Sequence, residues 1–188
     1  MTSWFRIRRR GRTVVFLGKR GVGKSSTLNF LFGFDRPTDA AAECTVAPFS
    51  KWVTAGAERR FRVVDMPGIA AGAGSDRDYG RDYRRWLGRA DTVVWLTQAN
   101  VRSYKMDQIF FRDYSRFVRP GTRLVFGISK ADVQFEGAGA DLMRRKEIDL
   151  LTEILPYTWA GPEAVTVVAY SIAAKWNTDG LESAFLST

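Results

Sequence analysis

The residues best suited to chemistry lie in one glycine-rich octapeptide near the start of the chain. It reads GKRGVGKS over residues 18–25, between an apolar run at residues 13–17 and a run with helical apolar spacing at residues 26–32. A glycine-rich turn that opens a helix presents free N–H groups and the positive end of the helix dipole to an anion. We therefore expect this turn to bind nucleotide phosphates, with Lys24 reaching the β- and γ-phosphate oxygens and the Ser25 hydroxyl binding Mg²⁺. The residues expected to contact the nucleotide here are Gly18, Arg20, Gly21, Val22, Gly23, Lys24, Ser25 and Ser26.

A second candidate segment, Asp65-Met66-Pro67-Gly68, follows an apolar run at residues 62–65. Asp65 can hold Mg²⁺ through water, and the N–H of Gly68 can contact a γ-phosphate. Thr45 lies about midway between the two segments, and we expect its hydroxyl to bind Mg²⁺ when a triphosphate is present. Thr38 competes for that role, in which case Thr45 would be an ordinary edge-strand threonine. Lys24, Thr45 and Gly68 are thus the predicted catalytic residues, and Ser25, Thr45 and Asp65 the predicted metal ligands.

Two later segments are suited to reading a base. In Ser129-Lys130-Ala131-Asp132, the Asp132 carboxylate can accept hydrogen bonds from guanine N1 and N2, a pattern that adenine does not offer. The aliphatic stem of Lys130 would cover the ring. Ser171-Ile172-Ala173 follows the last apolar run and would bring a backbone N–H to guanine O6, with Ser171 and Ile172 in contact. The sequence therefore favours a guanine nucleotide, and an ATPase would require Asp132 to face away from the base.

The composition excludes several other kinds of site. The chain has 188 residues and no histidine, which excludes Ser-His and Cys-His catalysis and histidine-ligated metals. Cys44 is the single cysteine, so an internal disulfide is excluded; beside Thr45 it is either a redox-sensitive thiol or an incidental one. Neither a bilayer-spanning apolar run nor a signal peptide is visible, and we expect a cytoplasmic protein, peripheral at a membrane or ribosome if it is attached at all.

The formal net charge of +9 is concentrated at the N-terminus. Five arginines lie within the first twelve residues without an acidic residue among them, at positions 6, 8, 9, 10 and 12. Arginine-rich segments attract RNA backbone or anionic lipid. We expect residues 1–11 to form a basic tail that contacts RNA, the ribosome or an anionic membrane, or that only aids solubility.

These segments need elements that bring their ends together. Near-continuous apolar runs at residues 91–96, 122–128 and 164–169 are typical of buried parallel strands, and residues 51–53 suit an antiparallel edge strand. Helical patterns cover residues 79–90, 107–118 and 142–155, and a short helix begins at Leu181. The alternation predicts one α/β domain over residues 12–188, with a doubly wound, mostly parallel six-stranded sheet and helices on both faces. In such sheets ligands bind at the carboxyl ends of the strands, where the candidate segments lie.

The ordered set of motifs resembles the translation-factor-class (TRAFAC) GTPases of the Era-like group. It is similar in particular to small bacterial GTPases of the YfjP/YeeP type, which are often labelled ribosome-binding. The stretches that support the resemblance are residues 18–29, residues 90–96 with 100–103, and residues 129–132, and the likeness extends over residues 12–185. The resemblance implies a P-loop G domain, GTP hydrolysis with Mg²⁺, and switch-like signalling. Ser129 stands where the family usually has an asparagine, which removes one amide that braces the loop.

The same resemblance sets expectations for the rate. Ras-like enzymes orient the attacking water with a glutamine after the DxxG glycine, but this chain has Ile69, which cannot hydrogen-bond water. Gly21 occupies the position of a K⁺-binding asparagine, so we do not expect K⁺ activation; Arg20 is either an arginine finger in cis or an exposed side chain. We expect a slow GTPase switch, stimulated by a homodimer through the switch face or by a partner. The alternative is a nucleotide-dependent binding module with negligible turnover.

A surface for an unidentified effector follows the second segment. Arg84, Arg85 and Arg89 are interleaved with Tyr83 and Trp86, where a partner could sense the nucleotide state. The same pattern fits an amphipathic helix with Trp86 and Leu87 in the core and the arginines in solvent.

Overall fold

The fold is described from a computed structural model, which covers residues 11–37, 47–55, 59–69, 75–134 and 139–186. Thr38, Cys44, Thr45 and residues 1–10 of the predicted tail lie outside the described residues.

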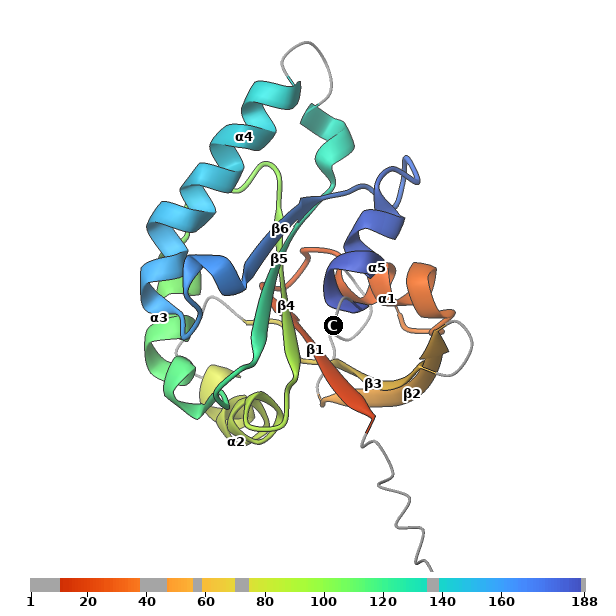
Figure 1. Ribbon diagram of the computed structural model, residues 1–188, viewed down its shortest axis with the longest axis vertical. Coiled ribbons are helices and arrows are strands. Elements are labelled where there is room, and N and C mark those ends of the chain that lie inside the picture. The colour runs from red at the N-terminus through yellow and green to blue at the C-terminus, as the bar shows by residue number, and fades with distance from the viewer. Residues whose placement is uncertain (1–10, 38–46, 56–58, 70–74, 135–138, 187–188) are drawn as a thin grey trace, which may run out of the picture.

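One six-stranded sheet organises the molecule (Figure 1). Its strands are β1 (Arg12–Gly18), β2 (Phe49–Ala55), β3 (Arg59–Asp65), β4 (Thr92–Gln98), β5 (Arg123–Ser129) and β6 (Val165–Ala169). They lie in the order β2-β3-β1-β4-β5-β6; β2 is antiparallel to β3 and every other pair is parallel. The predicted mostly parallel sheet with an antiparallel edge strand is therefore confirmed.

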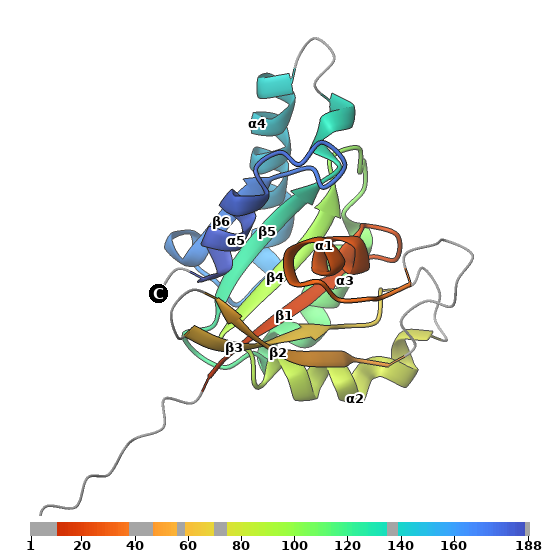
Figure 2. The ribbon, with the colours of Figure 1, turned by 90° about the vertical axis from the view of Figure 1, so that its right-hand side faces the viewer.

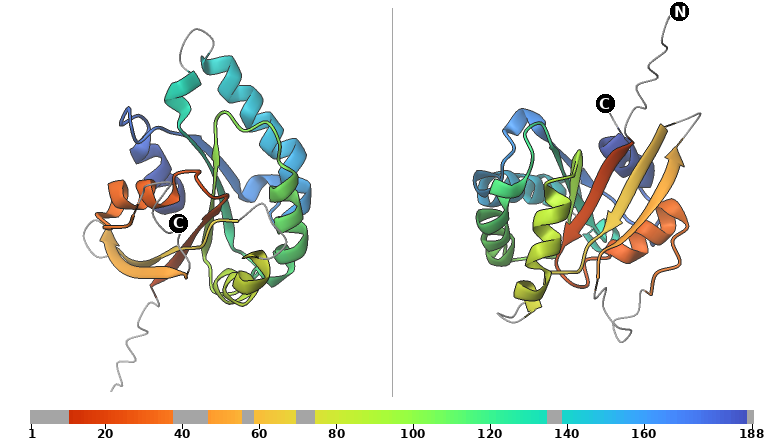
Figure 3. Two further views of the ribbon diagram at one scale, coloured as in Figure 1. Left: turned by 180° about the vertical axis from the view of Figure 1, so that it is seen from behind. Right: turned by 90° about the horizontal axis from the view of Figure 1, so that it is seen from below.

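Helices cover both faces of this sheet, as predicted (Figure 1, Figure 3). The five α-helices are α1 (Lys24–Phe32), α2 (Ser75–Leu87), α3 (Lys105–Tyr114), α4 (Gly139–Asp149) and α5 (Thr178–Leu186). Seen from below in the right panel of Figure 3, the sheet separates α1 and α5 from the other three helices. Short helical segments complete the chain: η1 (Ser115–Phe117), η2 (Ala131–Gln134), η3 (Leu150–Ile154), η4 (Leu155–Tyr157) and η5 (Pro162–Ala164).

The predicted helix boundaries are wrong by a few residues. The helices α2, α3, α4 and α5 begin before the predicted starts at residues 79, 107, 142 and 181, because their first turns are polar and precede the apolar pattern. α2 ends at Leu87, before Gly88, rather than at residue 90. The predicted helix to residue 155 is α-helical only to Asp149 and continues as a π-turn and a 3₁₀-turn. Pro156 lacks the amide hydrogen that would continue the α-helical hydrogen-bond ladder, so the α-helix cannot run on through it.

Alternate side chains of β1 point into two separate cores. Val15 and Leu17 pack under α2, α3 and the end of α4, whereas Val14 and Phe16 pack against α1 and α5. Aromatic rings dominate the first core; Trp95 lies 4.3 Å from Phe111 between ring centroids. Because both faces are tightly filled, the carboxyl ends of the parallel strands form a rigid edge for the loops that follow them (Figure 2).

Candidate nucleotide-binding site

The glycine-rich turn joins the end of β1 to the start of α1. At Gly18 a Cβ atom would lie 2.3 Å from the Leu96 carbonyl oxygen, so the turn leaves the sheet at a point that only glycine fits. Gly23 precedes α1 with a φ of 92° and supplies no side-chain cap, and the first turn of α1 carries no acidic residue. The N–H groups and the dipole at this helix end therefore receive neither a side-chain cap nor a carboxylate from the first turn of α1, which is the electrostatic setting for phosphate.

Lys24 is held inside the turn. Its side chain is buried, and Nζ donates hydrogen bonds to the carbonyl oxygens of Gly18 at 3.1 Å and Lys19 at 3.0 Å. Ser26 lies half-buried in the same first turn, whereas Arg20 is exposed. The ammonium group is thus placed over the concave side of the turn, where it could exchange carbonyl contacts for phosphate oxygens.

Asp65 and Ser25 form the candidate metal site. The Asp65 carboxylate is fully buried at the end of β3, and the Ser25 hydroxyl donates to its Oδ2 at 3.4 Å. Arg36 Nε lies 3.8 Å from the same oxygen. Within the described residues, no group of three or more His, Cys, Asp or Glu side chains could hold a metal by itself. A hydroxyl beside a carboxylate fits Mg²⁺, which prefers hard oxygen ligands and takes the rest of its shell from phosphate and water.

Gly68 and Ile69 run directly beside the phosphate turn. The Ile69 N–H donates to the Gly18 carbonyl and the Ile69 carbonyl accepts from the Arg20 N–H, both at 3.2 Å. A Cβ atom at Gly68 would lie 2.9 Å from Arg20 Cα, so this close approach requires glycine. The Ile69 side chain is buried in the first core, which keeps it away from any water at the phosphates.

The base-reading segment after β5 is fastened to the same turn. Ser129 Oγ lies 2.7 Å from the Val22 carbonyl oxygen and 3.0 Å from the Thr97 carbonyl oxygen, and its single proton is donated to one of them at a time. The hydroxyl therefore braces the phosphate turn in place of the missing amide. Lys130 extends back over the turn, with Nζ 3.3 Å from the Gly21 carbonyl oxygen.

Asp132 and the Ser171 segment come from adjacent strands. The Ala131 N–H donates to the Tyr170 carbonyl at 3.2 Å, which ties the η2 turn carrying the half-buried Asp132 to the end of β6. Ser171 is buried and pairs with Trp176 through two backbone hydrogen bonds, which closes a compact turn, and Ile172 packs against the second core. The structure thus brings together the predicted phosphate, metal and base segments, while Thr45 lies outside the described residues.

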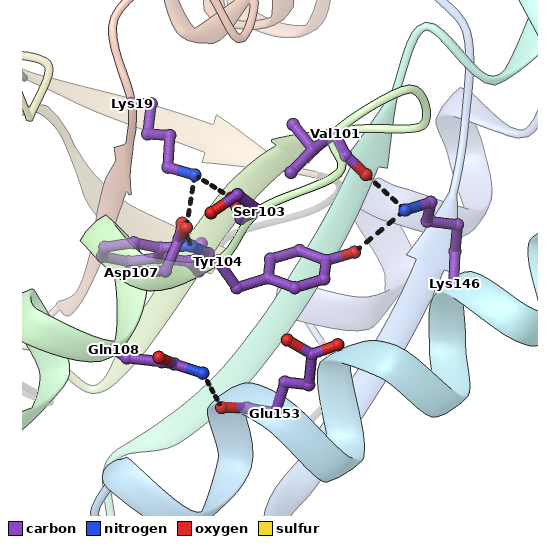
Figure 4. Close-up of polar contacts among 9 residues, drawn as sticks. Lys19, Val101, Ser103, Tyr104, Asp107, Gln108, Lys146 and Glu153 are labelled. Carbon is purple, nitrogen blue, oxygen red and sulfur yellow. Dashed lines mark hydrogen bonds and ion pairs between the residues drawn. The ribbon is translucent and has the colours of Figure 1, made fainter.

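The sequence analysis missed several residues that contact this turn. Gln98, at the end of β4, donates from Nε2 to the Gly21 carbonyl at 2.6 Å; its place at a strand end was a usable signal. Lys19 forms an ion pair with Asp107 of α3 (Figure 4). Burial raises the pKa of Asp107, while Lys19 and the Trp95 indole oppose that shift. No local pattern marks Asp107, because its partner is far away in the sequence.

A mostly parallel sheet of this strand order, with a phosphate turn after β1, a carboxylate at the end of β3 and a base segment after β5, defines a P-loop G domain. The model of the family described as 50S ribosome-binding GTPase matches residues 13–123, more than half of the chain. The chain belongs to that family of GTPases, which confirms the resemblance drawn from its motifs.

Individual relatives agree with this assignment. The chain is 35% identical to the uncharacterized protein YkfA of Escherichia coli K12 over 62% of this chain and 40% of that protein. It is 31% identical to the uncharacterized protein YfjP of the same organism over 70% of this chain and 45% of that protein. The chain therefore spans less than half the length of these relatives.

Among solved structures, the fold matches that of Era in complex with MgGDPNP and a stretch of 16S ribosomal RNA. The TM-score is 0.70 at 20% identity, over 94% of this chain and 57% of that chain. At this identity the match establishes the fold. Across the described ranges, none of the helices has the length and apolarity required to cross a membrane.

Proposed function

We propose that this chain binds GTP and GDP with Mg²⁺ and hydrolyses GTP to GDP and phosphate as a slow molecular switch. The observation that carries the proposal is the contact between Ser129 Oγ and the Val22 carbonyl. It joins the segment suited to guanine to the turn suited to phosphate, so that one guanine nucleotide would span both. The family membership supports GTP chemistry in general.

Catalysis would depend on positioning and charge, as in other phosphoryl transfers. Lys24 and the N–H groups of the turn would hold the β- and γ-phosphates, and the Gly68 N–H would contact the γ-phosphate. Ser25, Asp65 and Thr45 are the residues we assign to the metal. Bound Mg²⁺ would neutralise charge on the phosphate oxygens. Arg20, exposed beside the turn, is available to the γ-phosphate.

Slow turnover follows from Ile69. Its buried side chain cannot orient water, so a backbone group, another side chain or a partner must do so. An unaided switch GTPase turns over at about 10⁻⁴ s⁻¹, and a supplied arginine adds about 10³–10⁵. We propose that a homodimer through the switch face, or an effector, accelerates this chain. Ile69 equally favours the second candidate, a nucleotide-dependent binding module with negligible turnover.

The test combines nucleotide titration with phosphate release. Fluorescent GDP, GTP and ATP analogues are titrated with Mg²⁺ against the purified chain, and phosphate release is followed over a series of protein concentrations. We expect guanine-only binding and release that rises faster than linearly with concentration. Lys24→Ala should abolish binding, whereas Lys105→Ala, an exposed lysine on α3, should bind normally.

Other outcomes separate the alternatives. Guanine binding with flat, near-zero release would favour the binding module. Equal affinity for ATP would show that Asp132 does not read the base and would overturn the proposal.

We propose RNA as the polyanionic partner, bound through the basic tail and a neighbouring surface. We call that surface the arginine face; it consists of Trp52, Arg60, Arg62, Arg84, Arg85, Trp86 and Arg89. A cytoplasmic location, peripheral at the ribosome rather than a membrane, belongs to the same proposal.

A further inference from the structure

The Lys19 side chain connects the phosphate turn to α3. Its ammonium Nζ lies 2.5 Å from Asp107 Oδ2 and donates to the Ser103 carbonyl at 2.8 Å (Figure 4). Both partners belong to the segment that starts α3. The turn is therefore fastened at its second residue to a different element of the fold.

The surroundings of Asp107 orient its carboxylate toward Lys19. Its side chain is 1% exposed, and its Oδ1 accepts a hydrogen bond from the buried Trp95 indole Nε1 at 3.0 Å. The indole fixes the carboxylate so that Oδ2 faces Lys19. Burial disfavours the charged form of this carboxylate and raises its pKa. The Lys19 ammonium and the Trp95 indole favour the charged form, so a carboxylate buried this deeply needs a cation beside it. The pair therefore has one preferred geometry, unlike an ion pair between flexible surface side chains.

The backbone of Lys19 connects this ion pair to the candidate nucleotide site. Its carbonyl accepts the hydrogen bond from Lys24 Nζ at 3.0 Å, and Lys19 pairs with Ile69 in an isolated parallel bridge. A shift of Lys19 would move both the carbonyl that places Lys24 and the segment that carries Gly68.

The segment that contains Ser103 and Asp107 is also held by contacts with α4 on its other side. Lys146 of α4 donates to the Val101 carbonyl and, at 3.4 Å, to the Tyr104 hydroxyl, while Gln108 donates to the Glu153 carbonyl at 2.9 Å (Figure 4). The start of α3 thus lies between the phosphate turn and α4, and it acts as a fixed support.

We propose that Asp107 is a positioning residue for nucleotide binding, acting through Lys19 to hold the phosphate turn in its binding conformation. This inference rests on the proposed function, since it concerns the affinity of the same site. It assigns a role to a residue that would touch neither the nucleotide nor the metal.

The test is a double-mutant cycle on the full chain, with Asp107→Asn, Lys19→Gln and both together. Asparagine keeps the shape and the indole contact but removes the charge that holds Lys19. We expect each single variant to bind GDP about tenfold more weakly, and the double variant to bind no more weakly than either single one. Lys105→Gln is the matched control for Lys19→Gln, because it removes the same positive charge, here beside Asp107 at the start of α3, without breaking the pair; it should bind like the wild type.

A merely structural role predicts different results. If Asp107→Asn only lowers the melting temperature and binds GDP within twofold of the wild type, or if the two losses add, the proposal is wrong. Should Asp107→Asn fail to fold, the GDP affinities of Lys19→Arg and Lys19→Gln decide. Arginine keeps the positive charge, so Lys19→Arg should retain affinity. Equal losses of GDP affinity in these two variants would overturn the proposal.

A readout without nucleotide separates this inference from the proposed function. Hydrogen exchange of the amides at residues 18–24 is measured in the nucleotide-free protein. We expect faster exchange in Asp107→Asn and unchanged exchange in Lys105→Gln. That result would support the positioning role even if the wild type bound no guanine nucleotide, and unchanged exchange in Asp107→Asn would contradict it.

Discussion

A single hydroxyl connects the two halves of the candidate site. Ser129 is buried at the end of β5 and reaches the Val22 carbonyl of the phosphate turn, so a change in one segment is felt by the other. The Gln98 amide and the Lys130 ammonium contact the neighbouring Gly21 carbonyl. Three side chains from two strand ends thus hold the middle of the turn.

Removing this hydroxyl should weaken nucleotide binding without unfolding the protein. Ser129→Ala leaves the Val22 carbonyl without its donor, and one net hydrogen bond is worth about 1 kcal/mol, or roughly a fivefold loss of GDP affinity. Ser129→Asn restores a donor and should recover most of the affinity. Ser115→Ala, which removes a serine bonded to the Tyr157 carbonyl far from the site, is the control. Equal affinities in Ser129→Ala and Ser115→Ala would contradict the bracing role. Fluorescence titration measures all four proteins.

The sequence predicts a functional residue where its side-chain chemistry and its position after a strand point to the same role. The glycines, Lys24, Ser25 and Asp65 were found because each follows a recognisable strand at a fixed offset. Asp107 and Arg36 were not, since their contacts with Lys19 and Asp65 depend on how distant elements pack. The contact of the Ser129 hydroxyl with the Val22 carbonyl could not be predicted either, because a sequence does not show distances.

Among the elements, α3 supplies two buried rings to the aromatic core. Phe110 and Phe111 pack on Trp95 of β4, and Phe111 also contacts Phe126 of β5 and Trp159. The strands could be predicted from long apolar runs, as could the presence of each helix. Helix ends could not, because polar first turns and the π-turn before Pro156 carry no apolar period. The arrangement that presses α3 against Lys19 is likewise a product of tertiary packing.

Truncating this packing should destabilise the whole domain. Phe111 is fully buried, and Phe111→Ala removes a ring from a filled core, so we expect a loss of about 3–5 kcal/mol in the free energy of unfolding. Phe30→Ala removes the same side chain from an exposed position on α1 and should cost less than about 1 kcal/mol. Urea unfolding compares the two variants. A similar loss in both would mean that α3 does not anchor the core.

At the scale of the whole molecule, arginines of β3 and α2 cluster around two tryptophans. Arg62 lies over both Trp52 and Trp86, at 5.9 and 4.8 Å, while Arg85 and Arg89 also stack on Trp86. Within the described residues none of these arginines forms an ion pair. Gly11, which precedes β1, lies against the Trp52 ring at this face. Trp86 and Leu87 are buried and the arginines at positions 84, 85 and 89 exposed, which confirms the amphipathic interpretation of α2.

Stacked guanidinium groups leave their N–H edges for phosphate, and the half-exposed Trp52 offers a surface for a base. We therefore expect Arg85→Gln/Arg89→Gln to bind fluorescent oligouridine about tenfold more weakly. The salt slope should fall by about 1.4, at about 0.7 per lost phosphate contact. Arg144→Gln/Arg145→Gln on α4 lowers the net charge equally but should change binding much less. Fluorescence anisotropy over a salt series measures both pairs.

Equal losses in the two pairs would indicate unspecific attraction to a basic protein. Binding to anionic phosphatidylglycerol vesicles without binding to oligouridine would replace RNA with a membrane as the partner.

The central place of β1 has a consequence for the lifetime of the protein in a cell. A nucleotide held by the turn after β1, by Asp65 after β3 and by Asp132 after β5 would fasten three strand ends that lie on both sides of the centre. A ligand that binds only the folded chain adds about 2.7 kcal/mol of stability at a hundred times its Kd. Abundance would then follow guanine-nucleotide supply, because chains left empty in starvation unfold more often and meet proteases sooner.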